Sequence, residues 1–449
     1  MINVIDSHCG SGKSQSMIAL MNEAPKEERF IYVTPFLKEC ERIRKSCPGK
    51  HFKEPDEKAG KGSKQRHLQE LIEKNDNIVC THALFSLITR ETIDLLKDRP
   101  YTLILDEVLD VVEKYDILDG EDFTDEEKRD YADLDIKRFI NTGQIQIAEN
   151  GMLFINENDT LLSKYKSFED DIKKECLYLN LKEENNSPVK VFPPIIFNGD
   201  LFKDIYILTY QFESQKLFYY FQFFNIEYEQ YYATKDTEDN FIILPATNDD
   251  FMSQDSQWRE SIKQYIHVHQ DNGKKKYNEV GNDYYALSAN WYKKNLETEK
   301  FIALSVSLNS FFRKTPANKR MWTCFKAYQQ KPNKFKKALK KQRNSNNINL
   351  GKDIENFVSV NAKAINKYDN KTHLAYLVNR FYDPIITNFF NLNGISLKKE
   401  NIERMALADL IQWIWRSAIR KSEPEEIYIY IPSSRMRDLF CRWLNNEIF

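Results

Sequence analysis

The sequence predicts an α/β protein built around a parallel sheet. Three observations predict this class: short apolar runs alternate with helix-like segments over residues 1–110, the first run enters a glycine-rich turn, and a later run ends in two acids. Strands separated by helices pair in parallel, through crossover connections. The 449 residues exceed what one core usually serves, so two or three domains are expected.

The first lobe opens with a strand over residues 2–6, "INVID", a glycine-rich turn, "GSGK", and a helix over residues 14–24. The alternation of strands and helices then continues. Further strands are expected within residues 29–36, 76–88 and 101–110, with a helix over 37–47.

Residues 111 to about 200 are polar and are acidic between Asp116 and Asp135, so we expect an insertion into the first lobe. A buried strand is expected within residues 203–212, followed by an aromatic helix over 214–224 and a strand over 226–232. The first lobe is therefore assigned to residues 1–235.

The second lobe is assigned to residues 236–449, where helices and strands again mix. Helices are expected over 284–295 and 405–420, and strands over 355–362 and 426–432. A basic tract over residues 313–343 contains twelve Lys and Arg residues and no acid.

Composition excludes several classes of protein. Hydrophobic residues make up 41% and charged residues 29%, a soluble globular balance. No apolar run approaches the roughly 20 residues that span a bilayer, and no leader is visible, so we expect a cytoplasmic protein with no membrane partner. The seven cysteines form no CxxC pair, which argues against structural zinc and a disulfide framework.

The run "HCGSGKS" at residues 8–14 has the composition of a phosphate-binding loop. Backbone N–H groups and the start of the next helix surround phosphates, while one lysine reaches the β- and γ-phosphates. The candidate residues for ATP are Gly10, Ser11, Gly12, Lys13 and Ser14. The Ser14 hydroxyl would bind Mg²⁺, and Ser7 stands where this motif usually has its first glycine.

The run "LILDEVLD" ends an apolar strand in two carboxylates. Acids at the end of a buried strand are costly unless something uses them, and nucleotide-bound Mg²⁺ is the usual reason. Asp106 is therefore the candidate Mg²⁺ ligand, and Glu107 is the candidate general base.

The basic tract has the composition of a groove for single-stranded nucleic acid. Trp322, Phe325, Tyr328 and Phe335 are interleaved with its cations. Cations neutralise phosphates and aromatic rings stack on bases. Candidate nucleic-acid contacts in this tract include Lys334, Lys336 and Lys337, while a solvated basic helix remains the alternative.

These motifs, in this order, resemble those of the superfamily-two DEAD/DEAH-box-like helicases. The resemblance rests on Gly10 to Ser14, "VTP" at 33–35, "THAL" at 81–84 and "DEVLD" at 106–110, with "ILTY" at 207–210 in the place of the third motif. It implies two RecA-like lobes that bind ATP between them and nucleic acid across both. Thr34, Pro35 and Thr81 would then contact nucleic acid.

The run "QWIWRSAIR" at 412–420 resembles the family motif that supplies arginine fingers to the γ-phosphate. Gln412 and Arg416 fall at the family spacing, whereas Trp415 replaces a glycine and Arg420 comes one residue late. Because Arg416 and Arg420 are four residues apart, a continuous helix would place both on one face. Either arginine could be the finger, and an amphipathic core helix is the alternative.

The leading interpretation is an ATP-dependent helicase or translocase acting on DNA or RNA, with single-stranded DNA favoured. The Lys-, Asn- and Ile-rich sequence suits a phage or mobile-element replication protein, with replication or recombination proteins as partners. The alternatives are a terminase-type DNA-packaging ATPase, a small-molecule kinase, and a nucleic-acid-binding protein switched by ATP without translocation.

Overall fold

The computed structural model describes residues 1–117, 134–155, 161, 165–179, 188–197, 200–273, 276–296, 298–328, 355–360, 366–421 and 423–449. It divides into two compact units. The first comprises Met1–Ser7, Ser11–Thr247 and Tyr382–Lys398, and the second comprises His8–Gly10, Asn248–Phe381 and Lys399–Phe449.

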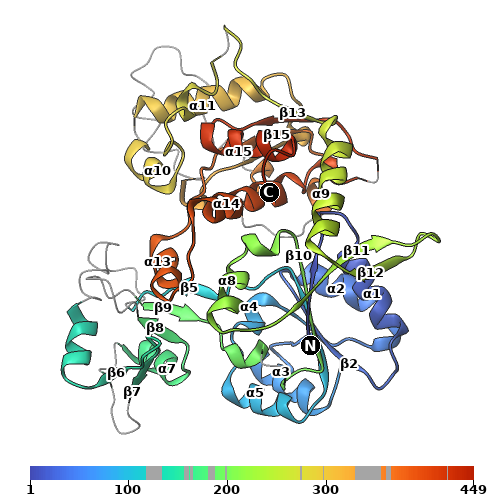
Figure 1. The fold of residues 1–449 in the computed structure, drawn as a ribbon, viewed down its shortest axis with the longest axis vertical. Coiled ribbons are helices and arrows are strands. Elements are labelled where there is room, and N and C mark those ends of the chain that lie inside the picture. The colour runs from blue at the N-terminus through green and yellow to red at the C-terminus, as the bar shows by residue number, and fades with distance from the viewer. Residues whose placement is uncertain are drawn as a thin grey trace. The chain divides into compact units, whose positions relative to one another are not determined.

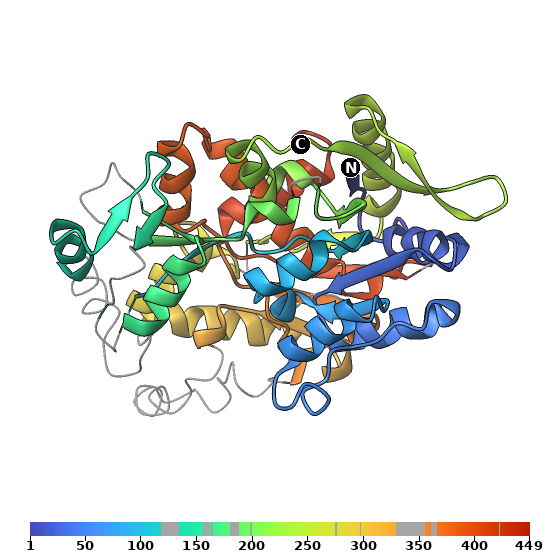
Figure 2. The same cartoon turned by 90° about the horizontal axis from the view of Figure 1, so that it is seen from below.

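The first unit is built on a seven-stranded sheet (Figure 1). In spatial order its strands are β12 (Phe241–Pro245), β11 (Glu229–Lys235), β1 (Ile2–Asp6), β10 (Asp204–Thr209), β4 (Tyr101–Asp106), β2 (Arg29–Thr34) and β3 (Ile78–Thr81). All neighbours pair in parallel except β11 and β12, whose hairpin projects beyond the rest of the sheet in Figures 1 and 2. The central strands are buried on both faces, as parallel strands covered by helices must be.

Helices cover this sheet on both sides. They are α1 (Lys13–Glu23), α2 (Leu37–Ser46), α3 (Lys64–Glu73), α4 (His82–Phe85), α5 (Arg90–Lys97) and α8 (Lys216–Phe223). Met17 and Met21 of α1 and Cys40 and Ile43 of α2 pack with the sheet residues of one core. In Figure 1, α4 and α8 lie on the opposite side of the sheet from α1.

The chain between β4 and β10 forms a small insertion with its own core. Its described strands are β5 (Val112–Lys114), β9 (Pro188–Val191) and β8 (Leu177–Leu179) in one sheet, and β6 (Ile145–Ile147) and β7 (Leu153–Ile155) in another, beside helix α7 (Lys166–Lys173). Ile145, Leu153, Phe168 and Leu177 belong to this core. Helix α13 (Pro384–Leu392) returns to the same unit, where Phe389 packs against Tyr178.

The second unit contains a four-stranded sheet in the order β13 (Ile266–Val268), β16 (Ile427–Tyr430), β15 (His373–Tyr376) and β14 (Arg320–Thr323). All three pairings are parallel. Its helices are α9 (Asn248–Lys263), α10 (Ala289–Asn295), α11 (Glu299–Phe312), α14 (Lys399–Ile414) and α15 (Ser434–Leu444). The predicted fold class, α/β with two parallel-sheet lobes and an insertion in the first, is confirmed.

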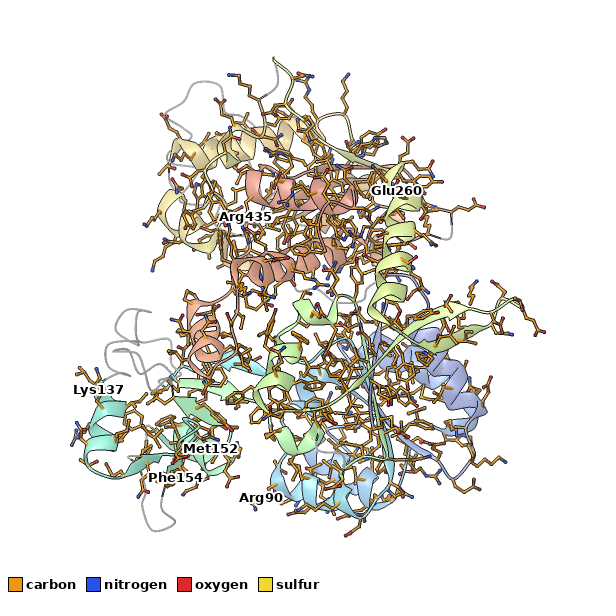
Figure 3. All side chains as sticks on the ribbon, in the orientation of Figure 1. Arg90, Lys137, Met152, Phe154, Glu260 and Arg435 are labelled. Carbon is orange, nitrogen blue, oxygen red and sulfur yellow. The ribbon has the colours of Figure 1, made fainter. Side chains whose placement is uncertain are left out.

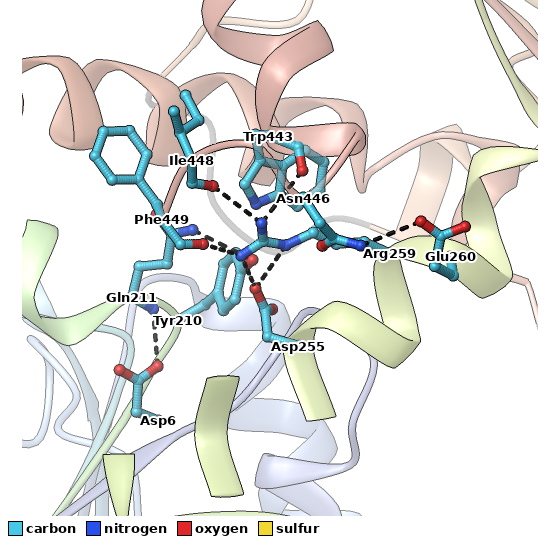
Figure 4. Close-up of polar contacts among 10 residues, drawn as sticks. All are labelled: Asp6, Tyr210, Gln211, Asp255, Arg259, Glu260, Trp443, Asn446, Ile448 and Phe449. Carbon is cyan, nitrogen blue, oxygen red and sulfur yellow. Dashed lines mark hydrogen bonds and ion pairs between the residues drawn. The ribbon is translucent and has the colours of Figure 1, made fainter. Parts of the chain in front are cut away.

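A buried arginine joins α9 to the last residues of the chain (Figure 4). The Arg259 Nε donates to Asp255 at 2.8 Å, and Nη1 donates to the carbonyls of Trp443 at 3.2 Å and Ile448 at 3.1 Å. Both Arg259 and Asp255 are only 2% exposed, so each charge is compensated by the other.

Three sequence predictions in the second half differ from the structure. The helix expected over 405–420 ends at Ile414, and a short 3₁₀ turn, η10 (Ala418–Arg420), follows. The helix expected over 284–295 begins only at Ala289, where Ser288 caps it. In the region expected as a strand over 355–362, the described residues form one isolated bridge, between Phe357 and Trp322.

None of the helices in the described part of the chain is long and apolar enough to cross a bilayer.

Candidate nucleotide site

The loop between β1 and α1 has the backbone geometry of a phosphate cradle. Gly10 and Gly12 have φ angles of 87° and 93°, the left-handed region that side chains disfavour. A Cβ atom on Gly12 would lie 2.2 Å from a ring carbon of Phe241 in β12. The left-handed backbone therefore favours glycine at residue 12, and a larger residue there would also force the Phe241 ring to move.

The polar groups of this loop suit an anionic ligand. Helix α1 begins at Lys13 with no side-chain cap and no acid in its first turn, which leaves its first N–H groups without side-chain acceptors. The buried Ser11 hydroxyl has no hydrogen-bond partner among the described residues. The Lys13 ammonium donates to the Ser7 carbonyl at 2.7 Å. The polar groups of this loop therefore fit the phosphates of a nucleoside triphosphate.

Ser7 has a structural role that explains why it replaces the usual first glycine. Its Oγ accepts a hydrogen bond from the backbone N–H of Ala233 in β11 at 2.7 Å, and its own N–H donates to the Thr209 carbonyl at 3.1 Å. Ser7 therefore fixes the start of the loop to two neighbouring strands.

The carboxylate of Asp106 lies beside the loop. β10 separates β1 from β4, and the carboxyl ends of these parallel strands lie at one edge of the sheet. The Ser14 hydroxyl approaches both carboxylate oxygens, at 3.1 and 3.3 Å, and the Tyr32 hydroxyl donates to Oδ2 at 2.9 Å. Two residues 92 positions apart in sequence, the candidate Mg²⁺ ligands Ser14 and Asp106, are thus brought together.

The pKa of Asp106 is raised to about 6 by burial, and the neighbouring Glu107 carboxylate adds to this effect. Hydrogen bonds from Tyr32 and Ser14 and the positive charge of Arg42 act in the opposite direction and favour the ionised carboxylate. A divalent cation would favour the ionised form further. Asp106 is therefore a partly buried acid whose ionised form a cation would stabilise.

Glu107 has an unusual backbone. Its φ of 70° lies in the left-handed region, and its N–H donates to the Leu208 carbonyl of β10 at 3.0 Å. This conformation is less stable by about 1 kcal/mol or more for a non-glycine residue. The Glu107 side chain is half-buried.

Three residues of this site were missed by sequence reasoning: Tyr32, His82 and Asp6. The His82 Nε2 lies 2.9 Å from the Asp106 carbonyl. The buried Asp6 carboxylate accepts the N–H groups of Gln211 and Phe212, both at 2.8 Å, and so fixes the turn after β10 to the end of β1 (Figure 4). An acid that ends an apolar strand was a usable signal for Asp6, as it was for Asp106.

The residues assigned to nucleic acid in the first unit end strands β2 and β3. Thr34 is fully buried and its hydroxyl has no partner among the described residues, whereas Pro35 is partly exposed. The Thr81 hydroxyl accepts the Leu84 N–H at 3.4 Å and caps α4. Thr34 and Thr81 would therefore contact a ligand through their backbone groups.

The arginines of the second unit occupy different environments. Arg416 is 6% exposed, and its Nη1 donates to the carbonyls of Ser359 at 3.2 Å and Val360 at 3.3 Å. Arg420 is exposed at the end of η10, and its side chain has no partner among the described residues. The expectation that both share one helical face is wrong because α14 ends at Ile414, before either of them. Gln412 is partly exposed within α14.

Lys334, Lys336 and Lys337, with the rest of the basic tract after Tyr328, lie outside the described residues.

A relative in Bacillus subtilis (strain 168) identifies the family. The SPβ prophage-derived uncharacterized protein YonV is 35% identical to this chain over 455 residues, and the match covers 99% of each. The chain belongs to the YonV family. A model described as the YonV C-terminal Rossmann-like domain matches residues 260–444, which contain the four parallel strands of the second unit. The relative's prophage origin agrees with the expected phage or mobile-element character.

Solved structures similar to the chain come from XPD and MrfA helicases. An apo XPD structure matches with a TM-score of 0.44 and 11% identity, covering 99% of this chain and 95% of its own. Xpd4 of S. tokodaii matches with a TM-score of 0.41 and 13% identity, covering 98% and 93%. The DUF1998 helicase MrfA bound to DNA and AMPPNP matches with a TM-score of 0.34 and 10% identity, covering 99% and 48%.

Proposed function

We propose that the chain is a superfamily-two helicase-like ATPase that couples ATP hydrolysis to movement on, or remodelling of, DNA or RNA. One observation carries the proposal: the Ser14 hydroxyl lies 3.1 Å from the Asp106 carboxylate, at the start of an uncapped helix. A hydroxyl and a carboxylate placed together beside a glycine-rich loop suit Mg²⁺-nucleotide binding.

Each residue has a distinct task. The loop N–H groups and Lys13 bind the phosphates, Ser14 and Asp106 hold Mg²⁺, and Glu107 accepts a proton from the attacking water. Bound Mg²⁺ would neutralise charge on the phosphates. Among the described residues no three His, Cys, Asp or Glu side chains form a metal cluster, so most Mg²⁺ ligands would be phosphate and water oxygens.

The finger assignment favours Arg420. Arg416 is buried and its guanidinium donates hydrogen bonds to two backbone carbonyls, whereas Arg420 is exposed. A finger must reach the γ-phosphate of a nucleotide held by the other lobe, so it needs a side chain able to change partners. Nucleic acid would stimulate hydrolysis by favouring the closed state in which the finger reaches the nucleotide.

The nucleic-acid substrate class follows from the order of the motifs along the chain. Among the similar proteins, MrfA is described as a helicase bound to DNA and to AMPPNP, and YonV is described as uncharacterized. The motif order therefore favours nucleic acid as the substrate, and the experiments use it.

The terminase-type alternative needs a cluster of carboxylates for a nuclease. Asp353 lies outside the described residues, and the other candidates, Glu355, Asp369 and Asp383, join no metal-binding cluster among those described. The described residues therefore give this alternative no support.

The test is ATP turnover by the purified protein with and without single-stranded DNA, compared with Lys13→Ala. Removing the ammonium leaves phosphate charge uncompensated in the transition state, so Lys13→Ala should lose both basal and stimulated hydrolysis. Wild-type turnover in a folded Lys13→Ala protein, or no turnover in the wild-type protein, would reject the proposal.

A further inference from the structure

An exposed aromatic cluster in the second unit has no role in the nucleotide site. It consists of Tyr284, Tyr285 and Phe381, and we call it the Tyr285 platform. The ring centroids lie 5.0 Å apart for Tyr284 and Tyr285, 5.6 Å for Tyr285 and Phe381, and 5.9 Å for Tyr284 and Phe381. Tyr285 is 65% exposed and Tyr284 is 39% exposed. Large rings are rarely left this open in a group without a ligand.

A buried hydrogen-bond network holds the platform in place. Asn379 is fully buried, and its Nδ2 donates to the carbonyls of Tyr284 at 2.7 Å and Ala286 at 3.0 Å. The N–H of Tyr285 donates to the Asp283 carboxylate at 2.9 Å. The two backbone segments that carry the rings are therefore held together before any ligand arrives, which lowers the entropy cost of binding.

The guanidinium group of Arg435 packs against two of the three rings. Arg435, which is labelled in Figure 3, lies in the first turn of α15, and its guanidinium carbon lies 4.4 Å from the Phe381 centroid and 5.7 Å from that of Tyr284. Its Nη1 donates to Asn379 Oδ1 at 3.0 Å and to the Arg380 carbonyl at 2.8 Å.

The charge of Arg435 is not compensated within the described part of the chain. Arg435 is 6% exposed, forms no ion pair with a described carboxylate, and its buried Nε has no hydrogen-bond partner there. A buried guanidinium without an anion is costly. Lys399, which is 74% exposed, lies 5.6 Å from the Tyr284 ring and forms an ion pair with Glu403 at 3.6 Å. The platform therefore combines aromatic faces with a buried guanidinium that has no carboxylate partner among the described residues.

We infer that the Tyr285 platform is a base-stacking subsite for single-stranded nucleic acid. Bases stack on the Tyr285 and Phe381 rings, and the strand's phosphates are attracted by Arg435 and Lys399. An apolar protein partner would gain nothing from the charge of Arg435. The inference rests on the proposed function, since it names where a nucleic-acid substrate meets the second unit.

The test compares two fluorescent strands of equal length and charge, an oligothymidine and an abasic strand, without nucleotide. The wild-type protein should bind the oligothymidine about tenfold more tightly, because one stacked base contributes on that order. Tyr285→Ala should lose this preference with unchanged affinity for the abasic strand, and Tyr285→Trp should restore it. Lys399→Gln should weaken both strands and lower the slope of log K against log salt by about 0.7.

The matched control is Tyr428→Ala, which removes another exposed tyrosine, 40% exposed, from β16 of the same unit. It should bind both strands like the wild-type protein. Equal affinity of Tyr285→Ala and wild type for oligothymidine overturns the inference. So does a finding that Tyr285→Ala disrupts only self-association in sedimentation, because the rings would then be a protein interface. Lys13→Ala should keep the preference, so failure of the ATPase proposal and failure of this subsite are distinguishable.

Discussion

The Tyr32 hydroxyl donates a hydrogen bond to Asp106 Oδ2 at 2.9 Å, from a fully buried position in the neighbouring strand β2. Burial and the Asp106 charge both raise the pKa of Tyr32, so this phenol stays protonated and acts as a donor. It therefore orients the carboxylate and favours its ionised form, which is the form that binds a metal.

Tyr32→Phe should fold normally and hydrolyse ATP at a higher Mg²⁺ requirement than the wild-type protein. The substitution keeps the buried ring and removes one hydrogen bond to a charged group, so we expect roughly a tenfold rise in the Mg²⁺ concentration for half-maximal turnover. A Mg²⁺ titration of ATPase activity measures it. The control is Tyr101→Phe, which removes a buried hydroxyl that donates to the Asp76 carbonyl in the same unit. Identical Mg²⁺ curves for Tyr32→Phe and wild type would show that Tyr32 does not position Asp106.

Glu107→Gln should bind ATP and leave it uncleaved, because the amide keeps the shape of the side chain and loses the base. Glu107→Gly should be equally inactive but at least as resistant to thermal unfolding as the wild-type protein, because glycine relieves the left-handed backbone at residue 107. Nucleotide binding, turnover and thermal unfolding of both variants measure these effects. A folded Glu107→Gln protein that cannot bind ATP would contradict the role given to this residue.

The two arginines of the second unit should behave differently. Arg420→Ala should bind ATP and nucleic acid nearly normally and lose stimulated hydrolysis by about 10³-fold, as expected for a finger. Arg416→Ala should instead lower the thermal stability, because two buried carbonyls lose their donor, at a cost of about 1–3 kcal/mol. Stimulated turnover and thermal unfolding separate the two effects. Full stimulated turnover in the Arg416→Ala, Arg420→Ala double variant would exclude a finger in this segment.

Neutralising the basic tract should weaken nucleic-acid binding in a salt-dependent way. Replacing Lys334, Lys336, Lys337, Lys340 and Lys341 with Gln should lower the slope of log K against log salt by about 0.7 for each single-strand phosphate that the tract no longer neutralises. Basal ATPase without nucleic acid should change little. The control replaces an equal number of exposed lysines of the first unit, namely Lys26, Lys38, Lys45, Lys58 and Lys61. If both sets reduce the slope equally, the tract acts only as general surface charge.

The sequence by itself determined the fold class and the positions of the nucleotide-site candidates. Strand, glycine-rich turn and helix follow one another at residues 2–23, and the acids of residues 106 and 107 end a buried strand. These are local signals, because each depends on a short periodic run and on the turn or charge that ends it. Parallel pairing then brings the carboxyl ends of the strands together, which is why Ser14 and Asp106 could be assigned to one site from sequence.

Only the tertiary structure decided what surrounds these residues. Tyr32 and Asp6 lie on strands whose sequence does not reveal which neighbour their polar groups meet, and the left-handed backbone of Glu107 has no local sequence signal. The end of α14 at Ile414 separated Arg416 from Arg420, although their spacing suggested one helical face. The Tyr285 platform joins segments almost a hundred residues apart through Asn379. Such contacts depend on long-range packing, which overrides local propensity and which no short stretch of sequence encodes.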